Sequence, residues 1–134
     1  MRARLCLVLG ALAALMGCDK FSADTSWQRG KYRLIAVDTR GQMYLAVDET
    51  QGSPTSVVGP TVFSIGADDG HIVVKQHPSK DAFGGFDRSV TNYFVADLVG
   101  AQRTVHGPLS VEDFNKLSAS ESLPAFTKTF DDLK

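Results

Sequence analysis

Six apolar runs of strand length alternate with polar turns along the chain. They cover residues 32–37, 43–47, 61–65, 71–76, 91–96 and 104–106. A short turn that contains aspartate and glycine joins the first run to the second, and another such turn joins the third to the fourth. Turns of this composition are typical of β-hairpins. The spacing therefore predicts an antiparallel sheet of five to six strands. Residues 49–59, rich in Gly, Ser, Thr and Pro, predict a surface loop.

A helix start follows the last strand. Ser110 precedes a segment with helical apolar spacing and can accept a hydrogen bond from the backbone of Asp113, whose carboxylate favours the positive end of a helix. The pattern predicts a helix over residues 111–118. Its apolar face, which we expect to pack on the sheet, consists of Val111, Phe114 and Leu117.

The last residues of the chain fit two structures. Phe126, Phe130 and Leu133 form a helical stripe, although Phe126 and Phe130 would also share one face of a strand, and we favour a short helix. The whole pattern predicts a single α+β domain over residues 30–134. We expect this domain to be mostly an antiparallel β meander with a C-terminal helix packed on the sheet.

The N-terminal segment reads as an export signal. Two arginines precede an apolar run of 11 residues, which is too short to span a bilayer. The run leads into residues 15–18, Leu-Met-Gly-Cys, which resemble the lipobox of bacterial lipoproteins. The resemblance implies that residues 1–17 are removed and that the Cys18 sulfur receives a lipid, with residues 18–29 as a tether. An ordinary secretory signal cut nearby, with Cys18 a free thiol, is the alternative.

This signal sets the compartment and the anchor. Several acyl chains hold a protein on a membrane effectively permanently, so we expect a lipid-anchored protein of the bacterial cell envelope that faces the periplasm. Asp19, directly after the anchor, resembles a retention signal for the inner membrane and favours it over the outer membrane.

Removal of the signal changes the charge and the cysteine count. The whole chain has 14 basic and 15 acidic side chains, and the mature chain has 12 and 15, a net charge of −3 that does not favour binding to nucleic acid. Cys6 leaves with the signal, and Cys18 is lipid-modified. Disulfides, cysteine nucleophiles and thiolate metal sites are therefore not expected in the mature domain.

The other chemical groups do not form a catalytic or metal-binding motif along the chain. The three histidines, His71, His77 and His106, lack the close spacing of a metal-binding pair and favour surface or turn positions. Asp68 and Asp69 favour a hairpin turn over a calcium loop, and there is no G-x-S-x-G elbow. We therefore expect no catalytic residue, no metal and no cofactor, and a protein that is not an enzyme.

Four short stretches, together with Phe114, carry a family resemblance: residues 60–66, 74–78, 93–97 and 107–110. They resemble a family of small bacterial lipoproteins known only as a domain of unknown function. The resemblance covers roughly residues 30–130. Because that family has no known activity, the resemblance implies no functional residue.

Residues 77–89 form the candidate binding surface. At 13 residues the segment is long for a structureless connection, and such loops are often functional. Its aromatic residues and the nearby basic ones predict a patch that meets an acidic partner or anionic headgroups. The members of this patch are Lys75, Lys80, Phe83, Phe86 and Arg88. The alternative is that the two phenylalanines fold back on the core.

We therefore expect a non-enzymatic accessory or binding lipoprotein that contacts a protein partner in the envelope. An immunity-type inhibitor of a toxin is the second hypothesis, since a small envelope-anchored domain is one way to neutralise an incoming toxin. A hydrolase of envelope polymers comes third, because no nucleophile, acid–base pair or metal set can be assembled from the sequence.

Overall fold

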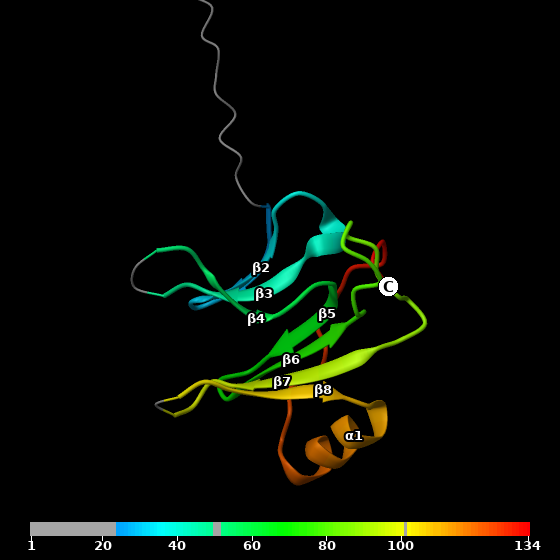
Figure 1. Cartoon of the computed structure of the whole chain (residues 1–134). Coiled ribbons are helices and arrows are strands. Elements are labelled where there is room, and N and C mark those ends of the chain that lie inside the picture. The colour runs from blue at the N-terminus through cyan, green and yellow to red at the C-terminus, as the bar shows by residue number, and fades with distance from the viewer. Residues whose placement is uncertain (1–23, 50–51, 101) are drawn as a thin grey trace, which may run out of the picture.

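Two antiparallel sheets stack on each other in the computed structural model, which describes residues 24–49, 52–100 and 102–134 (Figure 1). The first sheet consists, in spatial order, of β1 (Asp24–Arg29), β2 (Tyr32–Ala36), β3 (Tyr44–Val47) and β4 (Thr55–Val58). The second consists, in spatial order, of β8 (Thr104–Leu109), β7 (Asn92–Asp97), β6 (His71–Gln76), β5 (Val62–Ala67) and β9 (Lys128–Thr129). A 3-10 helix, η1 (Arg40–Gln42), lies between β2 and β3, and helix α1 (Val111–Ser120) follows β8.

The predicted hairpins are present, but the strands form two sheets. β2 pairs with β3 and β5 pairs with β6, both antiparallel. The prediction of a mostly antiparallel β fold with a C-terminal helix is confirmed, whereas the predicted number of strands is too low, since the described residues form nine. Each sheet is largely a meander of its own, and the chain changes sheets between β4 and β5.

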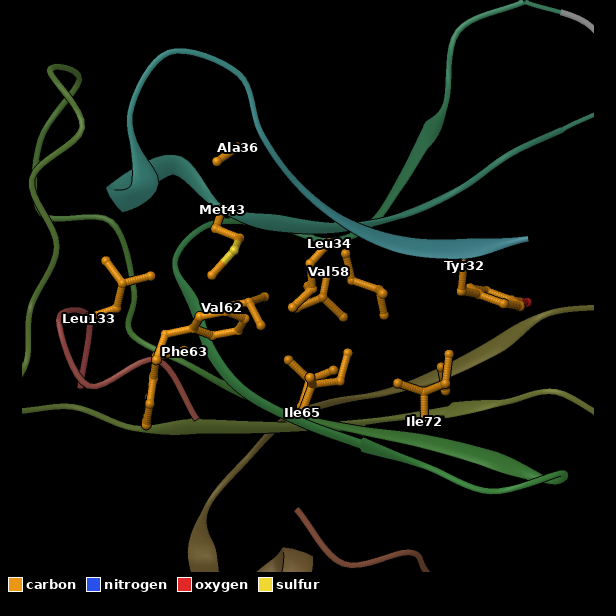
Figure 2. Close-up of a cluster of buried hydrophobic side chains, with 14 of the residues drawn as sticks. Tyr32, Leu34, Ala36, Met43, Val58, Val62, Phe63, Ile65, Ile72 and Leu133 are labelled. Carbon is orange, nitrogen blue, oxygen red and sulfur yellow. The ribbon is translucent and has the colours of Figure 1, made fainter. Parts of the chain in front are cut away.

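The main core lies between the two sheets (Figure 2). Leu34 and Val58 point from the first sheet toward Ile65 and Ile72 of the second, and all four side chains are at most 2% exposed. Burial of a side chain of this size contributes about 1.5–3 kcal/mol. This layer is therefore the principal source of stability and holds the two sheets together.

The second sheet is covered on its other face as well, by α1 (Figure 1). Val73 and Val95 point away from the inter-sheet core and pack against Phe114 of the helix, with Leu117 at the edge of the same cluster. Val111 is 44% exposed, so its predicted place on the packing face is wrong.

The predicted start of α1 is confirmed. The Ser110 hydroxyl accepts a hydrogen bond from the backbone N–H of Asp113 at 3.1 Å, which satisfies one of the free donors of the first turn. Within the described residues, no helix has the length and apolar character needed to cross a membrane.

Two strands lie where the sequence predicts none. β4 occupies part of the predicted loop 49–59, and β1 begins at Asp24, inside the predicted tether 18–29. Both are edge strands of the first sheet. An edge strand is paired on one side only, and β4 buries only its last residue, Val58, so it lacks the apolar alternation that a sequence pattern would reveal.

The tail forms a short strand, and the predicted helix is wrong. β9 pairs with β5, and the following residues Phe130 and Leu133 enter the inter-sheet core. Phe126 instead packs in the cluster under α1, so the tail passes from one face of the second sheet to the other. Gly66 permits this crossing, because a Cβ at that position would lie 1.9 Å from the Ala125 carbonyl oxygen.

Candidate functional site

Loop 77–89 is a hydrogen-bonded extension at one end of the second sheet. Ser79 and Phe86 form an antiparallel bridge, and the Lys80 N–H donates to the Gly85 carbonyl oxygen at 2.8 Å. The loop lies beside η1 and the C-terminal residues (Figure 1). The 13-residue loop therefore has an ordered backbone with hydrogen bonds of its own.

The tip of the loop is closed by Asp81. Its carboxylate accepts hydrogen bonds from the backbone N–H of Phe83 at 2.8 Å and of Gly85 at 3.2 Å. Gly84 has a φ of +88°, in the left-handed region that favours glycine. The turn leaves the Phe83 side chain 97% exposed.

The base of the loop is held by stacked rings. The His77 ring lies between Phe63, at 4.1 Å between centroids, and Phe86, at 6.0 Å. Its Nδ1 donates to the Val90 carbonyl oxygen at 2.7 Å, and the residue is 3% exposed, so the prediction of a surface or turn histidine is wrong for His77. Phe86 packs against the core, as the alternative interpretation holds, whereas Phe83 does not.

Two of the predicted basic residues, Arg88 and Lys75, make contacts away from Phe83. The Arg88 guanidinium lies 4.9 Å from the centre of the Phe86 ring and donates to the carbonyl oxygens of Asp132 and Lys134 at 3.0 and 2.6 Å. Lys75 lies over the Phe126 ring, at 4.5 Å, in the cluster under α1. The structure therefore does not gather these two cations with Phe83 into one patch.

A pocket of about 320 Å³ lies between the loop, η1 and the start of β5. Its wall is mostly small or polar and consists of Gly41, Gln42, Pro60, Thr61, Ser79, Asp81, Ala82 and Gly84. Phe83 itself does not line the pocket, although its two neighbours along the chain, Ala82 and Gly84, do. The pocket is at the low end of the volumes of small-molecule sites and suits a single polar side chain or small group.

A second group of polar side chains lies at the opposite end of β6, on the face that carries α1. The strand pairing sets His71 directly opposite Asp97 on β7, and His106 follows on β8. Nε2 of His106 lies 3.0 Å from one Asp97 carboxylate oxygen, and Nε2 of His71 lies 3.7 Å from the other. Glu121, at the end of α1, completes a set that can hold a metal ion.

Spacing along the chain misses this group, because its members come from four elements. A signal was nonetheless present in the sequence. His71 begins one predicted strand, Asp97 directly follows the next, and antiparallel pairing of neighbouring strands places such positions side by side. Glu121 carried no comparable signal, since its position depends on how α1 crosses the sheet.

The fold and these two surfaces define a small β-rich domain of two stacked sheets and one helix. The chain belongs to the family described as protein of unknown function DUF3997, whose profile matches residues 29–128. This match confirms the expected domain of unknown function, while residues 15–18 of the predicted lipobox lie outside both the match and the described residues. Comparison with the curated proteins and with the solved structures found no match.

Proposed function

We propose that this protein is a non-enzymatic binding protein of the bacterial cell envelope, attached to a membrane through a lipid on Cys18, which binds a protein partner through loop 77–89. The observation that carries the proposal is the 97% exposed Phe83 at the tip of a hydrogen-bonded loop. Burial of such a ring in a partner contributes about 1.5–3 kcal/mol. Large aromatic side chains in this setting are typical anchors of protein interfaces.

The construction of the loop supports a binding role. The bonds from Asp81 and the pairing of Lys80 with Gly85 fix the backbone around Phe83 before any partner arrives. A loop that is already ordered loses less conformational entropy on binding, and this preorganisation raises affinity. The backbone that carries the ring is thus held in place.

The charge of the loop favours a protein over an anionic lipid surface. Lys80 and Arg88 are balanced within residues 77–89 by Asp81 and Asp87, and the Arg88 guanidinium is bonded to backbone carbonyls of the tail. Attraction to anionic headgroups needs an excess of basic groups near the surface. The complementary partner offers an apolar pocket for the ring and a polar group for the adjoining pocket.

The proposed anchor limits where this partner lies. Residues 19–23 separate Cys18 from β1, and five residues span at most about 18 Å. The domain therefore stays near the bilayer surface. Its partner is another membrane protein or a periplasmic protein that approaches the membrane.

Site-specific crosslinking in the native host tests the binding surface. A photoreactive phenylalanine analogue replaces Phe83 in the full-length protein, and a matched variant carries it at Val99, which is 76% exposed on the turn after β7. We expect a defined crosslinked protein from position 83 and none from position 99. Equal crosslinking at both positions contradicts the proposed surface.

Affinity then measures the contribution of the ring. With the crosslinked partner purified, Phe83→Ala is expected to weaken binding at least tenfold, and Val99→Ala is expected to leave it unchanged. An unchanged affinity for Phe83→Ala removes the loop from the interface. A partner that is a toxin would specify the function as immunity.

The anchor has its own test. The intact mass of the protein extracted from membranes is expected to show a diacylglyceryl group on Cys18 and loss of residues 1–17. Cys18→Ser is expected to release the protein from the membrane fraction. An unmodified Cys18 in the membrane-extracted protein contradicts the anchor without affecting the crosslinking result.

A further inference from the structure

We propose that His71, Asp97 and Glu121 form a binding site for a divalent transition metal ion, with Zn²⁺ as the ion that best fits the donors. His106 orients the Asp97 ligand through a hydrogen bond, and the Asp68 carboxylate lies behind the His71 ring. The site lies on the outer face of the second sheet, beside the end of α1 and at the opposite end of β6 from loop 77–89. It departs from the sequence-based expectation of no metal and does not depend on the proposed binding function.

The distances between the donor atoms are close to those around a small tetrahedral ion. His71 Nε2 lies 3.3 Å from a Glu121 oxygen and 3.7 Å from an Asp97 oxygen, and the three donor atoms all lie within 4.8 Å of one another. Zn²⁺ with bonds of about 2.0–2.2 Å holds neighbouring donors roughly 3.3–3.6 Å apart. The half-exposed Glu121 side chain can close the remaining separation by rotating about its own bonds.

The donor types agree with the same ion. One imidazole and two carboxylates leave a fourth coordination position for water, which is the ligand count of an open zinc site. Imidazole disfavours Mg²⁺ and Ca²⁺, which prefer oxygen ligands throughout. The chemistry therefore selects a transition metal over the abundant alkaline-earth ions.

A second set of contacts holds the ligands in place. The Asp97 oxygen that does not face His71 lies 3.0 Å from Nε2 of His106, so this imidazole can donate to it and leave the other oxygen for the metal. On the far side of the His71 ring, Nδ1 lies 3.8 Å from the Asp68 carboxylate, which is fixed by bonds from the backbone N–H groups of Gly70 and His71. At 3.8 Å this carboxylate is beyond hydrogen-bond distance of Nδ1 and acts on the ring through its charge, so the contact between His106 and Asp97 is the one that orients a ligand.

The local charge also favours a cation. Among the described residues, the carboxylates of Asp97 and Glu121 lie within 4 Å of imidazole nitrogens and of no lysine or arginine. Glu121 is the C-cap of α1, whose last turn contains no basic residue to balance the negative end of the helix dipole. A bound divalent ion would neutralise both sources of negative charge at once.

Titration of the purified full-length protein with metal tests the site. After treatment with a chelator and its removal, calorimetry with Zn²⁺ is expected to show one site per chain, and Co²⁺ is expected to give the intense visible absorption of tetrahedral coordination. Absence of both signals overturns the proposal.

Matched variants locate the ion. His71→Ala is expected to abolish binding, and Glu121→Gln to weaken it at least tenfold, whereas Glu112→Gln, at the other end of the same helix, is expected to leave it unchanged. His106→Ala, which changes a supporting residue, is expected to weaken binding about 10- to 100-fold. Circular dichroism of each metal-free variant confirms that it is folded.

Two outcomes contradict the assignment. Wild-type affinity in Glu121→Gln or in His71→Ala places the ion elsewhere. An equal loss in Glu112→Gln attributes the effect to α1 as a whole. Phe83→Ala is expected to bind Zn²⁺ like the wild type, so the failure of this proposal is distinguishable from that of the binding loop.

Discussion

The two ends of strand β6 carry polar surfaces of different construction. Beyond Gln76, loop 77–89 is held mainly by hydrogen bonds between residues less than ten positions apart, with stacked rings at its base. At His71, the surface is assembled from β6, β7, β8 and the end of α1. The first surface can change in sequence without changing the fold, whereas the second exists only while three strands and a helix keep their register.

This difference predicts separate responses to mutation. A change that loosens α1 should disturb the group at His71 and spare the loop. A change in the stacked rings at the base of the loop should disturb the loop and spare the group at His71. Amide hydrogen exchange of each region, together with the free energy of unfolding from urea denaturation, separates the two responses.

The largest effect is expected for Phe114→Ala. Phe114 is 8% exposed, and its ring lies 4.8 Å from that of Tyr93 and 5.7 Å from that of Phe126. Truncation of a buried phenylalanine costs about 3–5 kcal/mol of unfolding free energy. Exchange should rise in α1 and at Glu121 and stay unchanged at the amides of Lys80 and Phe83. Equal increases in both regions would show that they are not independent.

Phe86→Ala should produce the opposite pattern with a smaller cost. The Phe86 ring is partly buried between His77 and the Arg88 guanidinium, so its removal is expected to cost about 2 kcal/mol. Exchange should rise at Lys80 and Asp87, whose N–H groups bond within the loop, and stay unchanged in α1. Phe83→Ala is the matched control and should leave the unfolding free energy unchanged, because that ring makes almost no contact with the rest of the domain.

The two surfaces also differ in how far the sequence alone predicts them. The loop is recognisable from its length and from its paired phenylalanines, since these are local features. What the pattern does not show is which ring points outward. Phe83 and Phe86 are chemically the same, and only the stacking of Phe86 on His77 and the turn at Asp81 separate their roles.

The group at His71 depends on which strands pair and in what register, and the spacing of residues along the chain does not give this information. The same limit applies to the fold. The hairpins and the Ser110 cap are local signals and are predicted correctly, whereas β1 and β4 are edge strands without an apolar pattern. The prediction of a helix in the tail fails for a related reason, since the tail crosses the sheet at Gly66 and its aromatic residues face two different clusters.

Ser110→Ala tests the dependence of the His71 group on α1 more gently. Loss of the hydroxyl removes the acceptor for the Asp113 N–H and is expected to cost about 1 kcal/mol. Exchange should increase at the first turn of α1 and leave the loop amides unchanged. Ser110→Asp should restore most of the stability, because aspartate is an equally good cap. A Ser110→Asp variant as unstable as Ser110→Ala would mean that the cap is not the cause.

The smallest expected effect is the loss of stability in acid that comes from Asp87 in the loop. Hydrogen bonds from the Ser89 hydroxyl and then from its backbone N–H lower the pKa of Asp87 below its ordinary value of 3.8. The unfolded chain therefore takes up this proton at a higher pH than the folded chain does. The small stabilisation is complete above a pH of about 3.8 and is lost as the pH falls through the lower folded pKa. It has no influence near neutrality.

An NMR titration of the Ser89 amide measures this pKa directly. The midpoint should lie below 3.8, because the ionised carboxylate accepts the hydrogen bonds from Ser89. In Asp87→Asn the titration of the Ser89 amide signal should disappear, and the chemical shift of the His71 amide should be the same as in the wild type. A Ser89 midpoint at or above 3.8 would show that the bond does not favour the ionised form. The Asp81 turn, the stacked rings and the backbone pairing would then hold the loop without a contribution from the Asp87 carboxylate.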